Sequence, residues 1–318
     1  MRLALSLAVI TAAGLAPADT RIATWDAGLS RNGPGLLLRD ILRADAGVVA
    51  AADLIATAQP DVLLLTGFDY DADGAALGAF AALLRARGLD YPLRLALPTN
   101  AGLPTGLDLN GNGRLGEAAD AQGWGRFYGE GAMALLSRLP LAGNVQDYTP
   151  LLWADVAPLP DGLPAGAADV LRLSSNGHWV VPVETTRGPV DLLVFAATTP
   201  AFSTFNAQRN AAELALWGRY LNDTPRDFIV LGKPNLDPDA GAGDHAAMAA
   251  FLADPLVHDL RPAGDKGTAT ADWPDGPGAL RVDYVLPSAA LAVQGAGILW
   301  PAEAALTAHA LVYIDLAE

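Results

Sequence analysis

Residues 60–71 read PDVLLLTGFDYD, and the centre of this segment is an unbroken apolar run. A short run of this kind between Pro60 and Gly67 is typical of a strand at the centre of a sheet that is covered on both faces. Just before it, Val48, Ala52 and Ile55 recur at the spacing of one helix face, and Pro60 closes that helix. The segment therefore predicts a helix followed by a buried strand, an order typical of α/β folds.

Short apolar runs and apolar residues at helical spacing also alternate over the rest of the chain. A second helix is predicted from Leu77, Phe80 and Leu84, and a third from a stripe that begins near Asn206. The last three predicted strands leave no room for helices between them, so the order mixes helical crossovers with antiparallel pairs. This order predicts one α/β domain over residues 19–318, with two mixed sheets packed face to face and helices outside. The predicted strands span residues 21–26, 61–66, 132–136, 179–184, 190–197, 228–231, 281–286, 291–299 and 310–315.

The composition excludes several classes of function. The 318 residues include 35 acidic and 20 basic ones, a net charge of −15, and only two lysines, Lys233 and Lys266. Proteins that bind nucleic acid rely on many contacts from basic residues to phosphates, so this charge makes a nucleic acid an unfavourable partner. Cysteine is absent, which excludes thiolate catalysis, iron–sulfur clusters and cysteine-bound zinc. A hydrophobic content of 52% excludes a disordered chain.

The first eighteen residues have the pattern of a secretory signal peptide. Arg2 precedes an apolar run over residues 3–15, and the small residues at 16–18 suit cleavage before Asp19. The alternative is a buried N-terminal helix. The run is too short to cross a bilayer comfortably, and we expect no membrane span elsewhere. The pattern predicts an exported protein, periplasmic or secreted.

Six short segments of the chain form a series of motifs: ATWDAG (23–28), PDVLLLTGFDYD (60–71), MALLSRLPL (133–141), GKPNLDP (232–238), LRVDYVLP (280–287) and TAHALV (307–312). In this order and spacing they resemble the endonuclease/exonuclease/phosphatase superfamily, and the resemblance covers essentially all of residues 19–318. It implies the four-layer α/β/β/α sandwich, related to deoxyribonuclease I, that the members of this superfamily share. Active members hydrolyse phosphodiesters or phosphomonoesters with Mg²⁺.

The resemblance assigns four residual catalytic positions. The family's first-strand Asn falls on Asp26, and the Asn of its Asp-x-Asn motif is Asn235. The Asp of the RVDY-like strand is Asp283, and the His of the final Asp-His pair is His309. The alternative interpretation is that Asp26, Asn235 and Asp283 cap turns at strand ends and that His309 is a satisfied, partly buried histidine.

The resemblance also implies that four functional groups are missing. Gly67 stands where the family has a metal-binding Glu, and Ala196 stands where it has a His. Lys233 replaces the Asp of Asp-x-Asn, and Ala308 replaces the Asp that we expect to orient His309. These losses predict a catalytically impaired protein, a pseudoenzyme or a ligand-binding protein that uses the family's cleft.

A small phosphorylated ligand or a protein is the expected partner. No cofactor is certain, and Mg²⁺ is expected only if the protein is active. We expect the ammonium of Lys233 to lie near Asp26, Asp283 or His309 and to stand in part for the missing cation. The alternative is an active metal-dependent phosphoesterase with a reorganised metal site of Asp26, Asp69 and Asp283, although a turn role is the favoured interpretation of Asp69.

A separate candidate site lies at residues 108–120. Asp108, Asn110 and Asn112 match the opening of a calcium loop, in which alternate side chains converge on one ion. The usual acidic residue at loop position 12 is Ala119 here, with Asp120 one residue late. Calcium binding and a surface turn rich in Gly and Asn both remain open.

Overall fold

The computed structural model describes residues 20–223, 227–302 and 306–317. The predicted signal peptide, residues 1–18, lies outside the described residues. Within the described part of the chain, every helix is too short or too polar to cross a membrane.

The first sheet has six strands, with β1 and β2 at its centre. These two strands run parallel, and Asp26 of β1 lies opposite Thr66 of β2. The chain crosses between them through two helices, as a parallel pair requires. In spatial order the strands are β12 (Val293–Leu299), β13 (Leu311–Leu316), β1 (Thr20–Leu29), β2 (Val62–Phe68), β4 (Ala132–Ser137) and β3 (Leu93–Leu95).

The second sheet has five strands and contains the hairpin of β6 (His178–Thr185) and β7 (Gly188–Ala196). Strands β6 and β7 are antiparallel neighbours, and β7 runs parallel to β8 after a crossover through a long helix. A further pair, β9 (Ala271–Trp273) and β10 (Gly278–Leu280), forms a separate small hairpin. In spatial order the strands of the second sheet are β11 (Tyr284–Pro287), β8 (Phe228–Lys233), β7 (Gly188–Ala196), β6 (His178–Thr185) and β5 (Gln146–Asp147).

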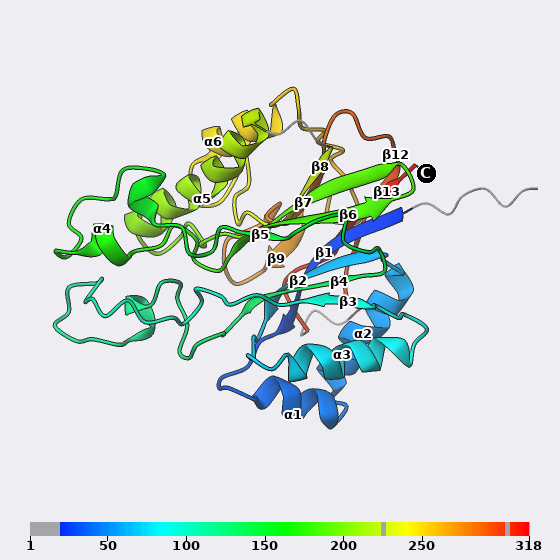
Figure 1. The fold of residues 1–318 in the computed structure, drawn as a ribbon, viewed down its shortest axis with the longest axis horizontal. Coiled ribbons are helices and arrows are strands. Elements are labelled where there is room, and N and C mark those ends of the chain that lie inside the picture. The colour runs from blue at the N-terminus through cyan, green and yellow to red at the C-terminus, as the bar shows by residue number, and fades with distance from the viewer. Residues whose placement is uncertain (1–19, 224–226, 303–305, 318) are drawn as a thin grey trace, which may run out of the picture.

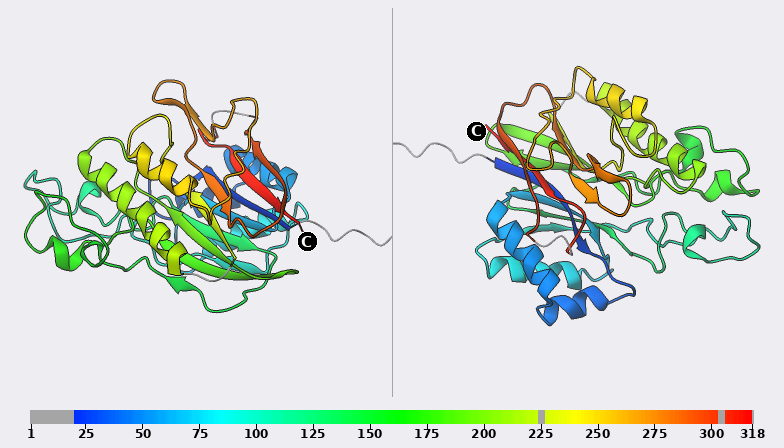
Figure 2. Two further views of the ribbon diagram at one scale, coloured as in Figure 1. Left: turned by 90° about the horizontal axis from the view of Figure 1, so that it is seen from above. Right: turned by 180° about the vertical axis from the view of Figure 1, so that it is seen from behind.

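Helices cover the outer face of each sheet, so the predicted four layers are confirmed (Figures 1 and 2). The helices α1 (Leu36–Leu42), α2 (Ala46–Ala58) and α3 (Ala75–Arg85) pack on the first sheet. The carboxylate of Asp45 caps α2 by accepting a hydrogen bond from Gly47 N at 3.0 Å. The helices α5 (Thr204–Asp223) and α6 (His245–Leu252) pack on the second sheet.

The core between the two sheets is apolar over most of its length. Alternate residues of β1, β2, β7 and β8 point into it, among them Ile22, Leu64, Leu192 and Leu231, all fully buried. A pleated strand sends every second side chain to the same face, so residues further along these strands with the same parity also point inward. That parity decides which side chains reach the end of the sandwich.

Two long connections project beyond the sheets. The first runs from β3 to β4 and contains the one-turn helix Ala118–Asp120, and the second contains Trp153–Asp155 and α4 (Ala167–Val170). They extend to the left of Figure 1. The amide of Asn100 joins them by donating to Thr149 O at 2.8 Å and Ser174 O at 2.7 Å.

Some elements differ from the sequence prediction. The strand predicted at 281–286 begins only at Tyr284, because the backbone N–H groups of Val282 and Asp283 donate to the Thr270 hydroxyl, both at 2.9 Å. Helices α1, α4 and α6 and the β9–β10 hairpin were not predicted; α1 and α4 have only 7 and 4 residues, too few for a clear helical period.

A polar network is buried beneath α5. His178 is fully buried, and its Nε2–H donates to the carbonyl of Glu213 at 3.1 Å, which leaves Nδ1 to accept from the Ser174 hydroxyl. The Glu213 carboxylate accepts from Ser175 N at 2.6 Å and from Thr198 N at 2.7 Å. Burial lowers the pKa of His178 to about 3, so this ring is neutral in the folded protein.

This pKa predicts a loss of stability in mild acid. Unfolded His178 binds a proton below about pH 6.5, whereas the folded ring does so only near its depressed pKa. Stability therefore falls as the pH drops through this window, by about 1.4 kcal/mol per pH unit. We expect urea unfolding at about pH 7 and about pH 5 to show a smaller pH dependence for His178→Gln than for the wild type. Equal pH dependence in both proteins would contradict this account.

Candidate functional site

A polar group of side chains closes the inter-sheet core at one end of the sandwich. Asp26 lies four residues after Ile22 on β1, so its side chain is on the same inward face of the strand. Lys233 lies two residues after Leu231 on β8 and is on the inward face for the same reason. Ala196, the last residue of β7, lies opposite Lys233 in the parallel ladder. The carboxyl ends of two parallel pairs, β1–β2 and β7–β8, thus meet at this end.

Lys233 and Asp26 form an ion pair that joins the two sheets. Both side chains are mostly buried, with exposed fractions of 17% and 13%. Burial alone would raise the pKa of Asp26, but the charges of Lys233 and His309 outweigh it and hold the pKa below its ordinary value. Burial likewise opposes charge on Lys233, but Asp26 and Asp283 raise its pKa. The predicted position of Lys233 beside the acids is confirmed.

His309 and Asp283 form a second pair beside the first. His309 Nδ1 lies 2.8 Å from Asp283 Oδ2, which also accepts a hydrogen bond from the Thr270 hydroxyl at 3.1 Å. Burial lowers the pKa of His309, but the charges of Asp283 and Asp26 raise it above the usual value overall. The expectation that Ala308 leaves His309 without an orienting carboxylate was wrong, because Asp283 supplies that carboxylate from the segment just before β11.

Trp273 completes the surroundings of His309. Its indole lies edge-on to the imidazole, with ring centroids 5.2 Å apart and an interplanar angle of 88°. The β9–β10 hairpin that carries it is fixed by backbone bonds from Asp272 N to Ala308 O at 2.9 Å and from Ala310 N to Thr270 O at 2.7 Å. Sequence reasoning missed Trp273, since only the paired backbone segments bring it to His309.

Gly67 faces the carboxylate of Asp26. It has φ +64°, a left-handed conformation that suits glycine, and a Cβ added there would lie 2.4 Å from Asp26 Oδ1. The space beside Gly67 is therefore filled by the carboxylate of Asp26, which is itself held by Lys233.

The residues present do not fit a divalent cation between Asp26 and Lys233. Mg²⁺ needs about six oxygen ligands in octahedral geometry. Here the Asp26 carboxylate is already hydrogen-bonded to the ammonium of Lys233. Among the described residues, no three His, Asp or Glu side chains are placed to hold a metal ion. Asp283 Oδ1 is buried and has no hydrogen-bond partner in the described part of the chain, but one free oxygen is far from an octahedral set.

Asn235 adjoins the site through the backbone. It has φ +55°, its N–H donates to Val282 O at 3.2 Å, and its side-chain amide donates to Ala197 O at 2.7 Å. The amide thus ties the loop after β8 to the end of β7. Of the four residual family positions, Asp26, Asp283 and His309 come together directly, and Asn235 lies one residue from Asp283 across this backbone bond.

Asp69 bonds to the loops that flank the site. Its carboxylate accepts from the Ser30 hydroxyl at 2.7 Å, from Arg31 N at 2.8 Å and from Gly131 N at 3.0 Å. Burial raises its pKa, and these three donors act against that effect. The contacts correspond to the turn role considered for this residue.

The candidate calcium loop is folded on itself by its own side chains. The Asp108 carboxylate accepts from Asn112 N at 3.1 Å and from Gly113 N at 2.7 Å, and the side-chain Oδ1 of Asn110 also accepts from Asn112 N at 3.0 Å. The Asp120 carboxylate turns back and accepts from Leu109 N at 2.9 Å. Asp120, not position 12, therefore closes the loop.

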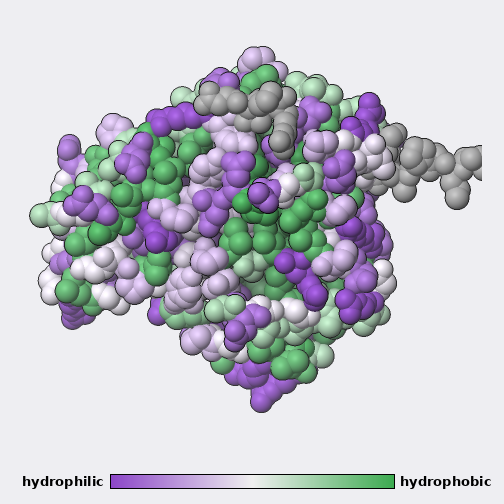
Figure 3. Space-filling view, in the orientation of Figure 1, coloured by the Kyte–Doolittle hydropathy of each residue, from purple (hydrophilic) through white to green (hydrophobic). Residues whose placement is uncertain are grey.

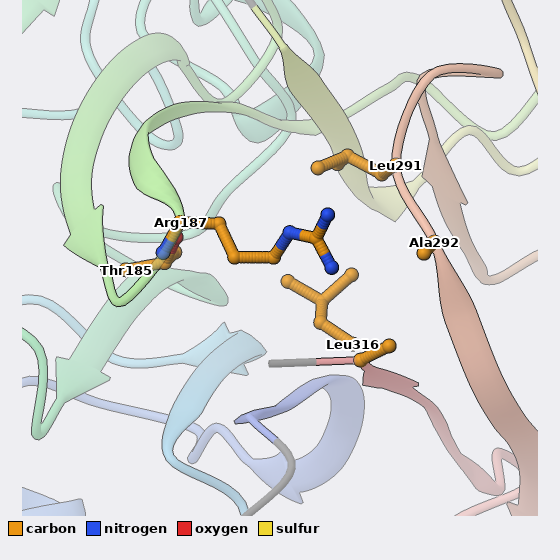
Figure 4. A pocket seen from close by; sticks show the side chains of 6 residues that line it. Thr185, Arg187, Leu291, Ala292 and Leu316 are labelled. Atoms are coloured by element: carbon orange, nitrogen blue, oxygen red, sulfur yellow. The ribbon is translucent and has the colours of Figure 1, made fainter. Parts of the chain in front are cut away.

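A small pocket at the other end of the sandwich is unrelated to these groups. It is lined by Thr185, Arg187, Leu291, Ala292, Leu316 and Ala317 (Figure 4). Thr185 ends β6 and pairs with Gly188 at the start of β7, whereas Ala196 ends β7 at the candidate site. Arg187 extends into this pocket between Leu291 and Leu316.

The close approach at Gly67 predicts that Gly67→Ala destabilises the protein. A side chain in the left-handed conformation costs about 1–2 kcal/mol, and the added methyl also displaces Asp26 from Lys233. Gly78→Ala is the matched control, because Gly78 lies within α3 with open space around its Cβ position, and this change is expected to be neutral or stabilising. Equal free energies of unfolding for the two variants would contradict the role of Gly67.

Comparisons with known proteins agree with this architecture. The crystal structure of an endonuclease/exonuclease/phosphatase from Beutenbergia cavernae superposes with a TM-score of 0.63 and 20% identity, covering 94% of this chain and 72% of that one. Sphingomyelinase C from Streptomyces griseocarneus gives a TM-score of 0.52 and 16% identity over 93% of this chain and 99% of that one.

A third solved structure is a 3′ phosphatase, NExo from Neisseria, bound to product DNA hairpin. It gives a TM-score of 0.52 and 19% identity, covering 93% of this chain and 99% of that one. A search of curated protein sequences found no match. The family model described as Endonuclease/Exonuclease/phosphatase family matches residues 23–308. The chain belongs to the endonuclease/exonuclease/phosphatase family.

Proposed function

We propose that this protein is a catalytically impaired member of its family that holds a small phosphorylated ligand in the family's cleft. The observation that carries the proposal is the Lys233–Asp26 ion pair, which puts a fixed cation where active relatives are expected to hold a carboxylate beside the metal. A lysine is a point charge that binds phosphate well without a metal ion.

The donors around Lys233 support binding of an anion. An ammonium has three N–H donors, so the bond to Asp26 leaves two of them for a ligand. Asp283 engages Nδ1 of His309, and Nε2 is therefore the ring atom that remains to donate. Both groups have raised pKa values, so both are favoured in their charged forms.

The same groups disfavour rapid hydrolysis. Activating water needs a base that is unprotonated near the working pH, and the raised pKa of His309 favours the protonated ring instead. The charge of Lys233 is already compensated by Asp26, which leaves less of it for the charge that builds up on phosphorus.

A second candidate function is phosphoester hydrolysis by a reorganised site. It is favoured by the Asp283–His309 pair, in which a carboxylate orients an imidazole at hydrogen-bond distance. In that case Asp26, Asp69 and Asp283 would be the candidate ligands for Mg²⁺, and Lys233 would have to move away from Asp26.

Calorimetry with inorganic phosphate tests the binding function. We expect Lys233→Met to weaken phosphate binding by roughly tenfold or more, since a charge-assisted hydrogen bond contributes about 1.5–3 kcal/mol. Lys233→Arg keeps the charge and part of the binding. Lys266→Met, which removes the chain's other lysine, is the control and should bind as the wild type does. Equal binding by Lys233→Met and the wild type would refute the proposal.

Hydrolysis of bis-p-nitrophenyl phosphate separates the two candidate functions. We expect the wild type to release no nitrophenolate above the buffer rate, with or without Mg²⁺ or Mn²⁺, and to bind neither ion at micromolar concentration. Metal-dependent release that is lost in His309→Ala would establish the hydrolytic alternative.

We also propose that the protein is exported, with residues 1–18 removed. The support is the sequence pattern of Arg2, the apolar run and the small residues before Asp19. N-terminal sequencing of protein recovered outside the cytoplasm should begin at Asp19, and exported material that begins at Met1 would contradict cleavage.

A further inference from the structure

A cavity of about 380 Å³ opens beside the start of α3 and the edge strand β3, and the proposed function makes no use of it. Arg94 of β3 and Ala96 just after it line the cavity and, being two residues apart, lie on the same face of the sheet. Ala96 packs with the core beneath the helices, so this is the outer face of the first sheet, whereas Asp26 points to the inner face. The helix side of the cavity is lined by Leu77, Gly78 and the turn at 71–74.

The walls of the cavity leave room for a small molecule. Leu77 is buried and forms an apolar surface, and an added Cβ at Gly74 or Gly78 would meet no heavy atom within 4 Å. The volume lies within the range of about 300–1,000 Å³ that is usual for small-ligand sites. Over α1 and α3, polar and apolar residues are interspersed without the continuous apolar patch that is typical of a protein interface (Figure 3).

The cavity also presents one carboxylate and one guanidinium that do not neutralise each other. Asp73 and Arg94 both line it, and neither side chain forms an ion pair or a hydrogen bond within the described part of the chain. The carboxylate of Asp71 is engaged instead, because it caps α3 by accepting from Ala75 N at 2.7 Å and from Ala76 N at 2.9 Å. Asp73 and Arg94 therefore remain available to a ligand.

We propose that this cavity binds a small zwitterion, an α-amino acid with an apolar side chain. The guanidinium of Arg94 matches a carboxylate through two parallel N–H donors, and the carboxylate of Asp73 accepts from an ammonium group. A simple anion would be repelled by Asp71 and Asp73, and a simple cation by Arg94, so a ligand that carries both charges is favoured. Leu77 and Ala96 then contact its apolar side chain.

Titration of isotope-labelled protein with L-leucine, followed by NMR, tests this site. We expect the amide signals of Gly74 and Gly78 to shift and to saturate at millimolar leucine. Leucinamide has no carboxylate and isocaproate has no ammonium group, so each loses one charged contact and should bind roughly tenfold more weakly or worse. Equal binding of leucine and either analogue would overturn the assignment to a zwitterion.

Three variants assign the contacts. Gly78→Leu fills the cavity at a helical position that tolerates leucine, and it should abolish leucine binding. Arg94→Gln should weaken binding of leucine roughly tenfold and leave leucinamide unaffected, because leucinamide offers no carboxylate. Asp73→Asn should likewise weaken leucine and leave isocaproate unaffected. Arg85→Gln, which changes an exposed arginine in the last turn of α3, is the control and should bind as the wild type does.

The cavity is independent of the candidate site around Lys233. Lys233→Met should therefore bind leucine as the wild type does, whatever its effect on phosphate. Loss of leucine binding in that variant would place the ligand at the candidate site and overturn a second site. Absence of shifts at Gly74 and Gly78 in the wild type, or equal binding by Gly78→Leu, would overturn the proposal and leave the proposed function untouched.

Discussion

The ion pair between Lys233 and Asp26 is the interaction on which this end of the molecule depends. It joins the first sheet to the second at the point where their apolar core ends. A mostly buried ammonium and a mostly buried carboxylate each lose hydration, and their pairing offsets that loss, with further support from the charges of His309 and Asp283. Removing one partner of such a pair typically costs about 3–5 kcal/mol, because the other charge is left unpaired. The pair is therefore both a structural contact and the main electrostatic feature of the cleft.

Several differences from the family pattern are linked through this pair. With Lys233 in place, the carboxylate of Asp26 turns into the space next to Gly67, where a longer side chain at that position would collide with it. Ala196 lies beside Lys233 in the ladder, and its small side chain leaves room for the lysine stem. A side chain added at Gly67 would therefore displace Asp26 from Lys233. The contacts among Lys233, Asp26 and Gly67 therefore fit one another, although these residues differ from those that the family resemblance implies.

The second pair, Asp283 and His309, is held in place by hydrogen bonds of the Thr270 side chain. The hydroxyl of Thr270 accepts hydrogen bonds from two backbone N–H groups and donates one to the Asp283 carboxylate. These bonds take the place of strand pairing at this point and orient the aspartate toward the imidazole. The β9–β10 hairpin then packs Trp273 against the other side of the ring. His309 is thus oriented and its charged form is favoured, which suits a group that donates to an anion.

The sequence by itself determined the layers, the central strands and most of the site. Unbroken apolar runs predicted β2 and β8, because a strand buried on both faces is apparent in the local sequence. The resemblance of six segments to the family assigned Asp26, Lys233, Asp283 and His309. Only the tertiary structure decided that Asp283 orients His309, that Asp26 fills the space beside Gly67 and that Asp120 closes the loop at 108–120. Each of these depends on atoms brought together from separate segments, and their meeting is set by register, side-chain parity and packing, which spacing along the chain does not reveal.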